Sequence, residues 1–185
     1  MKKALFLDRD GVIIDYIPYL SKPEQVKLPT EAGNALKIWQ SAGYELVVFT
    51  NQSGISRGYF TLEDVNAIHQ RIKSEYEQFE VKFSEILICP HQPSDNCDCR
   101  KPSPKLLLEY AEKYNVDLGR SYFIGDAPSD IECAINADCQ PILVLTGRGK
   151  ETLNHLGKYP QKIPVYPNLQ ATTELIVNST QNSEG

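Results

Sequence analysis

The chain has 185 residues, of which 41% are hydrophobic and 23% are charged, a balance typical of a compact globular protein of one domain. The formal net charge is −5 and no run of lysine or arginine forms a basic patch, so we expect no nucleic-acid partner. No stretch approaches the roughly 18 consecutive apolar residues of a membrane helix, so we expect no membrane partner either.

Short apolar runs alternate with longer amphipathic segments along the chain. The apolar runs predict buried strands at residues 4–7, 45–49, 85–89, 122–124 and 142–145. The segments between them predict helices, one ending near Gly43, one opening at Thr61 with Asp64 completing a capping box, and one starting at Ser103 and Pro104. This alternation predicts an α/β fold with a doubly wound, mainly parallel open sheet. In such sheets ligands bind beyond the carboxyl ends of the strands.

The predicted domain spans residues 1–177, because no repeat, low-complexity segment or linker divides it. Residues 178–185 are polar and offer nothing to bury, so we expect a disordered tail there. Only residues 4–7 form an apolar run before Asp8, which is too short for a signal peptide. We therefore expect a cytoplasmic location, in a reducing compartment. We also expect the protein to be a monomer.

An acidic motif, Asp8-Arg9-Asp10-Gly11, directly follows the first predicted strand. One carboxylate can attack a phosphorus atom while the other donates a proton, which makes phosphoryl transfer a two-step process through an aspartyl-phosphate. A calcium loop or a polar turn is the alternative, but an EF-hand needs a third acidic or Asn position before its glycine.

A polar segment after the second strand has the composition of a phosphate cradle, with a hydroxyl, amides and unhindered backbone N–H groups. Its residues are Thr50, Asn51, Gln52, Ser53 and Gly54. By itself the segment fits a tight polar turn better than a cradle.

Further charged residues follow the third and fourth strands. Asp126 can complete a Mg²⁺ site begun by Asp8, since Mg²⁺ prefers a few carboxylates plus water and phosphate oxygens. Asp130 can belong to the same loop or simply cap the following helix. Arg100 and Lys101 supply cations, and a fixed lysine is the usual companion of the metal in phosphoryl transfer.

Four soft ligands lie within eleven residues in the pattern C-x-H-x₅-C-x-C, namely Cys89, His91, Cys97 and Cys99. Three thiolates and one imidazole make a closed tetrahedral Zn²⁺ site, which is structural because no coordination position stays open. We expect zinc to order the loop of residues 89–101 and so to present Arg100 and Lys101. The alternative is a set of free thiols, which is how we interpret Cys133 and Cys139.

The order of these motifs, each after a strand, resembles the haloacid-dehalogenase (HAD) phosphatase superfamily over nearly the whole chain. The resemblance implies a capless Rossmann-like phosphatase with Asp8 as nucleophile and Asp10 as general acid and then base. It also implies Mg²⁺ held by the Asp8 carboxylate, the Asp10 backbone carbonyl and Asp126. Thr50 and Asn51 would hold the transferring phosphate, and Lys101 would neutralise it.

Two bacterial branches of that superfamily are similar in the cysteine-rich insert: D-glycero-D-manno-heptose 1,7-bisphosphate 7-phosphatases and histidinol-phosphate phosphatases. Ser53, the pair Arg57-Gly58 and residues 145–149 resemble the heptose branch. That branch implies release of a 7-phosphate from a sugar precursor of surface polysaccharide, with histidinol phosphate as the alternative substrate. A zinc-stabilised binding module without activity is the alternative of another class.

The resemblance also marks a substrate loop with Tyr16 and Tyr19, whose rings can pack on a sugar or fold back onto the core. Ala127 stands where heptose enzymes often carry lysine. The missing charge would then come from Arg57, Arg148 or Lys150.

Overall fold

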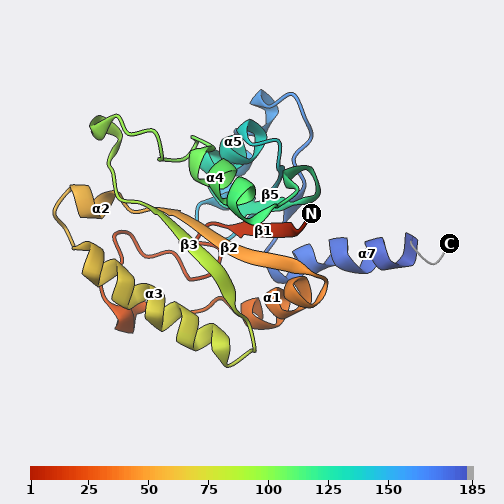
Figure 1. Cartoon of the computed structure of the whole chain (residues 1–185), viewed down its shortest axis with the longest axis horizontal. Helices are drawn as coiled ribbons and strands as arrows, with labels where there is room; N and C mark the ends of the chain where they lie inside the picture. The colour runs from red at the N-terminus through yellow and green to blue at the C-terminus, as the bar shows by residue number, and fades with distance from the viewer. Residues whose placement is uncertain (183–185) are drawn as a thin grey trace.

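The computed structural model describes residues 1–182 and contains one six-stranded, all-parallel sheet in the order β3-β2-β1-β4-β5-β6 (Figure 1). The strands are β1 (Lys3–Leu7), β2 (Tyr44–Asn51), β3 (Phe83–Cys89), β4 (Tyr122–Gly125), β5 (Gln140–Val144) and β6 (Val165–Tyr166). The five expected strands are confirmed. Strand β6 is not predicted from the sequence, because two residues between Pro164 and Pro167 show no alternation that indicates a strand.

Helices cover both faces of the sheet, with α1 and α3 on one face and α4 and α5 on the other (Figure 1). Their bounds are α1 (Ala32–Ser41), α2 (Ser53–Ser56), α3 (Leu62–Glu77), α4 (Lys105–Tyr114), α5 (Pro128–Asn136), α6 (Gly149–Leu153) and α7 (Glu174–Asn182). The expected capping box opens α3: Thr61 Oγ1 accepts from the Asp64 N–H at 3.1 Å, and Asp64 Oδ2 accepts from the Thr61 N–H at 2.8 Å. None of the helices within residues 1–182 is long and apolar enough to cross a membrane.

Strand β1 is anchored in the core on both faces of the sheet. Ala4 and Phe6 point into the core cluster on the α4 side, while Leu5 and Leu7 point into the cluster on the α1 side, and all four are buried. Burying a large apolar side chain stabilises the fold by roughly 1.5–3 kcal/mol. Because β1 is anchored on both faces, the residue that follows it has a well-defined position.

The chain end differs from the expected disordered tail at residues 178–185. Helix α7 continues through Asn182 because Leu175 and Ile176, near its start, pack against the core and anchor the helix. The remainder of that expected tail, residues 183–185, lies outside the described residues.

Candidate active site

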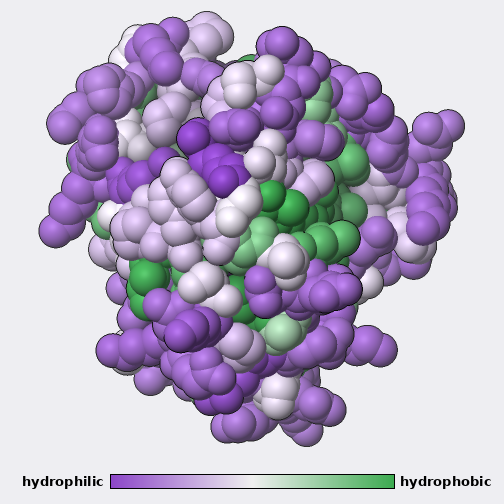
Figure 2. Space-filling model, turned by 90° about the vertical axis from the view of Figure 1, so that its left-hand side faces the viewer, coloured by the Kyte–Doolittle hydropathy of each residue, from purple (hydrophilic) through white to green (hydrophobic). Residues whose placement is uncertain are grey.

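The ends of the parallel strands bring the expected site residues to one edge of the sheet. Asp8 follows β1, Asn51 ends β2 and Asp126 follows β4. A cavity of about 310 Å³ opens at this edge. Figure 2 views the left-hand side of Figure 1, where α2 and the loops after the strands lie; hydrophilic residues frame a middle region of hydrophobic and intermediate ones.

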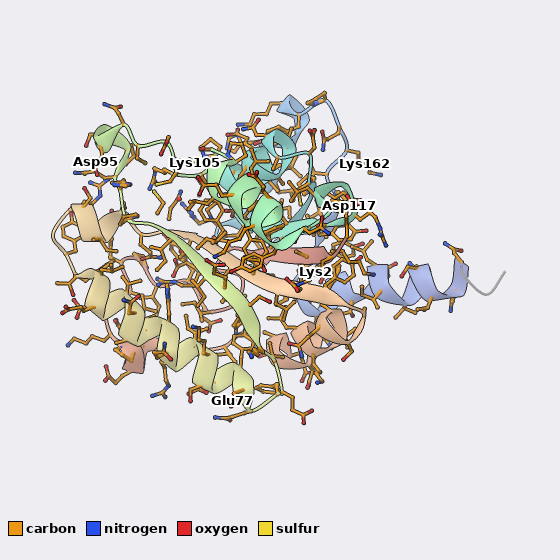
Figure 3. All side chains as sticks on the ribbon, in the orientation of Figure 1. Lys2, Glu77, Asp95, Lys105, Asp117 and Lys162 are labelled. Carbon is orange, nitrogen blue, oxygen red and sulfur yellow. The ribbon has the colours of Figure 1, made fainter. Side chains whose placement is uncertain are left out.

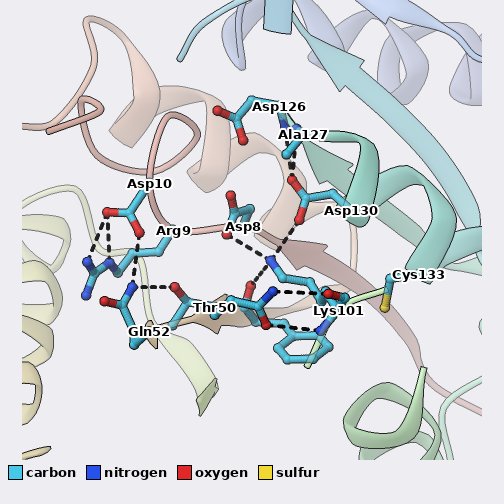
Figure 4. A network of polar contacts seen from close by, with 12 residues as sticks. Asp8, Arg9, Asp10, Thr50, Gln52, Lys101, Asp126, Ala127, Asp130 and Cys133 are labelled. Carbon is cyan, nitrogen blue, oxygen red and sulfur yellow. Dashed lines mark hydrogen bonds and ion pairs between the residues drawn. The ribbon is translucent and has the colours of Figure 1, made fainter. Parts of the chain in front are cut away.

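Lys101 lies at the floor of the cavity and is only 3% exposed. Its Nζ donates to Asp8 Oδ1 at 2.9 Å, to Asp130 Oδ1 at 2.7 Å and to the Phe49 carbonyl at 2.7 Å (Figure 4). Burial alone lowers the pKa of Lys101, but the Asp130 and Asp8 carboxylates outweigh burial and raise that pKa above its ordinary value. The lysine is therefore a fixed cation.

Asn51 fixes the backbone of that lysine. Its Oδ1 accepts from the Lys101 N–H at 3.0 Å, and its Nδ2 donates to the Lys101 carbonyl at 3.3 Å. One amide side chain thus satisfies both backbone groups of Lys101. Because Asn51 ends β2, this strand fixes the position of the Lys101 backbone at the cavity.

Three carboxylates, Asp8, Asp126 and Asp130, have oxygen atoms that all lie within 4.8 Å of one another, and we call them the carboxylate cluster. Burial, reinforced by its two neighbours, raises the pKa of Asp126 to about 9. Burial, followed by repulsion from Asp130, also raises the pKa of Asp8, although Lys101 opposes the shift. The single positive charge of Lys101 cannot neutralise three buried carboxylates.

The geometry around Asp126 leaves one of its oxygens without a partner. Oδ2 accepts from the Arg148 N–H at 2.9 Å, whereas Oδ1 is buried and has no hydrogen bond within residues 1–182. Two glycines make room beside this carboxylate: a Cβ on Gly11 or Gly147 would lie 2.4 or 2.3 Å from Oδ2. An orphaned oxygen and surplus negative charge fit a hard divalent cation such as Mg²⁺.

Asp10 is held by two neighbours (Figure 4). Its Oδ1 accepts from Arg9 Nη2 at 2.9 Å and from Arg9 Nε at 3.2 Å, and its Oδ2 accepts from Gln52 Nε2 at 3.1 Å. The same Gln52 nitrogen donates to Thr50 Oγ1 at 2.8 Å. Thr50 is fully buried and is not among the residues that line the cavity, so Gln52 lies between it and Asp10.

Most of the expected site residues line the cavity: Asp8, Asp10, Tyr16, Tyr19, Asn51, Gln52, Ser53, Arg57, Arg100 and Lys101. Tyr16 and Tyr19 are 41% and 50% exposed, while Ile17 between them packs on the core, so the loop folds back onto the core only in part. The Arg148 guanidinium also lines the cavity and lies over the Tyr16 ring, 5.5 Å from its centroid.

Three polar residues that line the cavity are not among the site residues predicted from the sequence: Arg9, Ser129 and Asp130. For Asp130 the sequence allows two roles, one in the acidic loop and one as a helix cap. The geometry fits both, because Oδ2 accepts from the Ala127 N–H at 3.1 Å while Oδ1 accepts from Lys101 Nζ. The four-residue spacing from Asp126 was the available signal. Arg9 and Ser129 carried no signal of their own.

The four soft ligands converge in residues 89–101, which we call the zinc loop after the ion that its sequence predicts. Their ligand atoms lie within 4.8 Å of one another, with Cys89 Sγ 3.7 Å from both Cys97 Sγ and His91 Nδ1, and Cys99 Sγ 3.4 Å from His91 Nδ1. Zn–S bonds of about 2.3 Å in a tetrahedron place two sulfurs about 3.8 Å apart. Cys99 Sγ and Cys89 Sγ are closer, at 3.1 Å. Figure 3 shows Asp95 at the far end of this loop and Lys105 where the chain enters α4.

Comparisons with known proteins agree with this arrangement. Residues 98–172 match the HAD-hydrolase-like family model. The chain is 40% identical over 181 residues to the D-glycero-beta-D-manno-heptose-1,7-bisphosphate 7-phosphatase of Pseudomonas aeruginosa, covering 95% of this chain and 98% of that protein. A Helicobacter pylori relative of the same name is 40% identical over 144 residues, covering 77% and 83%.

Solved structures show the same likeness. The D,D-heptose 1,7-bisphosphate phosphatase of Bordetella bronchiseptica, complexed with magnesium and phosphate, superposes with a TM-score of 0.90 at 34% identity, covering 96% of this chain and 99% of that one. The Burkholderia thailandensis enzyme gives a TM-score of 0.74 at 30% identity, covering 95% and 99%. The chain therefore belongs to the D-glycero-D-manno-heptose 1,7-bisphosphate 7-phosphatase family of the HAD-like phosphatases.

Proposed function

We propose that this phosphatase removes the 7-phosphate of D-glycero-β-D-manno-heptose 1,7-bisphosphate through an aspartyl-phosphate on Asp8. The observation that carries the proposal is the buried Asp8–Lys101 pair, 2.9 Å apart, at the floor of a cavity that also contains Asp10. The substrate is the one named for relatives that align over nearly their whole length.

In the first step, an Asp8 oxygen attacks the phosphorus, the bond from phosphorus to the C7 oxygen breaks, and Asp10 gives its proton to the departing sugar oxygen. In the second step, Asp10 takes a proton from a water molecule, whose oxygen attacks the phosphorus. The bond between phosphorus and Asp8 breaks, so inorganic phosphate leaves and the Asp8 carboxylate is restored. Lys101 offsets negative charge on the phosphoryl oxygens throughout.

Asp8, Asp126 and the Asp10 backbone carbonyl are the groups that we propose to hold Mg²⁺. The cation would neutralise the carboxylates and polarise the phosphoryl oxygens. The orphaned Asp126 Oδ1 and the surplus of buried negative charge support this assignment. Asn51, Gln52 and Ser53, which line the cavity, are the proposed contacts of the transferring phosphate. Thr50 is buried behind Gln52 and would support that contact through its hydrogen bond to Gln52 Nε2.

A second phosphate on the substrate requires further cations on the cavity wall. Arg57, Arg100 and Arg148 line the cavity, and none of the three is ion-paired with a carboxylate within residues 1–182. Tyr16 and Tyr19 can meet the sugar on the same side. We propose that the 1-phosphate binds this group of arginines, because guanidinium pairs with phosphate through two parallel hydrogen bonds.

We propose that the zinc loop binds Zn²⁺ as a structural ion through Cys89, His91, Cys97 and Cys99. Thiolate ligands persist in a reducing compartment, which supports a cytoplasmic location. The protein would act there as a monomer on a small soluble sugar phosphate.

The test is phosphate release by the purified protein with Mg²⁺ from heptose 1,7-bisphosphate, histidinol phosphate and hexose phosphates. We expect kcat/KM to be highest for the heptose substrate, and Asp8→Asn to be inactive on all three. A preference for histidinol phosphate would overturn the substrate assignment. Absence of release from every substrate would favour a binding module without activity.

A further inference from the structure

Helix α3 contributes a buried polar side chain that the proposed chemistry does not use. His69 is 4% exposed, and its Nε2 lies 3.2 Å from Arg9 Nη1, although the two residues are 60 positions apart in the sequence. Arg9 is itself 1% exposed. A buried guanidinium is stable only when its N–H groups have partners, so this contact has an energetic role.

The partners of Arg9 divide its guanidinium into two sides. Nε and Nη2 both donate to Asp10 Oδ1, and Nη1 faces His69. Burial, together with the nearby charges of Arg9 and Lys73, lowers the pKa of His69 to about 3. The neutral imidazole can therefore accept a hydrogen bond from Arg9 Nη1, with the ring proton on Nδ1.

These bonds decide which oxygen of Asp10 is available for proton transfer. Two N–H groups of Arg9 occupy Oδ1, whereas Oδ2 accepts one N–H from Gln52 and keeps a lone pair. If the guanidinium turned, the carboxyl group of Asp10 would turn with it. The backbone of this loop is fixed independently, because the Ile13 and Ile14 N–H groups bond to the Arg9 carbonyl.

We propose that His69 is a positioning residue, which orients Arg9 so that Asp10 presents Oδ2 to the departing sugar oxygen. This inference rests on the proposed function in one respect, the assignment of Asp10 as proton donor. His69 is not among the residues that line the cavity. It acts through Arg9 alone.

The test compares two leaving groups in the same variants. An alkoxide such as the sugar oxygen needs a proton as it leaves, whereas 4-nitrophenolate does not, and kcat/KM reports the steps through phosphorylation of Asp8. We expect His69→Leu to lower kcat/KM for the sugar phosphate by roughly 10- to 100-fold, which is the loss typical of a misplaced catalytic group. The same variant should change kcat/KM for 4-nitrophenyl phosphate by less than about threefold. His69→Gln should recover most of the loss, because its amide oxygen accepts from Arg9.

Tyr76→Phe is the matched control. Tyr76 lies two turns along α3 from His69 and donates its hydroxyl proton to the Ile13 carbonyl in the same loop. Within residues 1–182 no hydrogen bond joins it to Arg9. It should lower the thermal stability yet leave the ratio of the two kcat/KM values unchanged. Equal losses on both substrates in His69→Leu, or failure of His69→Gln to recover the rate, would overturn the inference.

Two further measurements separate this inference from the proposed function. Asp10→Asn should show the same preference for the good leaving group; if it does not, the proton-donor assignment fails whatever His69 does. The Arg9 Nε–H signal in ¹⁵N NMR needs no turnover. It should exchange slowly with solvent in the native protein and in His69→Gln, and broaden in His69→Leu. An unchanged signal in His69→Leu would refute the positioning role.

Discussion

The carboxylate cluster and the zinc loop lie at the same edge of the sheet but are built in different ways. The cluster gathers Asp8, Asp126 and Asp130 from the ends of two strands and the start of a helix, and all three are buried. The zinc loop takes its four ligands from eleven consecutive residues, and Cys97 and Cys99 are only partly buried. The first depends on the whole sheet, and the second depends on a local segment.

The two regions meet at Lys101, where the zinc loop ends. The cysteine and histidine spacing predicts that zinc presents this lysine. In the structure Asn51 binds its backbone, while Asp8, Asp130 and the Phe49 carbonyl bind its ammonium. The sheet edge therefore holds Lys101 through contacts outside the loop. Loss of zinc and loss of a cluster carboxylate should have unequal effects on turnover.

The largest effect is expected in the carboxylate cluster. Asp8→Asn keeps the shape of the side chain but removes the nucleophile, so phosphate release should fall at least about 10³-fold. Because Lys101 keeps Asp130 as a partner, the melting temperature should move by less than about 4 °C. Residual turnover within tenfold of the native protein would show that Asp8 is not the nucleophile.

The carboxylate cluster should also make the free energy of unfolding depend on pH when divalent cations are chelated. Folded Asp126 keeps its proton up to a pKa of about 9, whereas the unfolded chain loses it near 3.8. Between those values the folded state binds more protons, so its contribution to stability is full below about pH 4 and is lost as pH rises towards 9. Urea unfolding at several pH values in EDTA should show this decline.

Asp126→Asn is the control for that decline, because it cannot titrate and should flatten the slope. Added Mg²⁺ should stabilise the native protein most at high pH, where the carboxylates are ionised, and should restore the activity that EDTA removes. If the free energy of unfolding depended on pH equally in the native protein and in Asp126→Asn, the pKa of Asp126 would not be raised in the folded state.

A smaller effect is expected on the cavity wall above the cluster. Arg148→Ala removes a guanidinium but leaves the backbone N–H that bonds to Asp126, so KM for the bisphosphate should rise roughly tenfold with little change in kcat. The KM for 4-nitrophenyl phosphate, which has one phosphate, should change little. Equal rises for both substrates would mean that Arg148 meets the transferring phosphate instead.

The smallest effect on turnover should come from the zinc loop. Cys97→Ser should lower the zinc content and the melting temperature, but reduce kcat/KM by less than about tenfold, since Lys101 keeps its sheet-edge contacts. Metal analysis and thermal unfolding measure the first two. Cys139→Ala is the matched control, because this buried thiol lies outside the ligand group. If Cys97→Ser lowered kcat/KM as much as Asp8→Asn does, turnover would depend on the zinc loop as strongly as on the carboxylate cluster.

Features that depend on short stretches of chain were predictable from the sequence alone. Apolar runs located five strands, the Thr61 and Asp64 spacing located the start of α3, and the C-x-H-x₅-C-x-C pattern located the zinc loop. Strand ends then predicted which carboxylates would meet, because parallel strands place their carboxyl ends at one edge.

The partner that each side chain takes, in contrast, depends on how the whole chain folds. The contacts of Lys101 with Asp8 and of Arg9 with His69 join residues 93 and 60 positions apart, a separation over which no sequence period operates. Helix α7 likewise extends through Asn182 because two residues near its start reach the core. Side-chain direction at such positions follows from packing and charge balance in the folded chain, which a linear pattern does not contain.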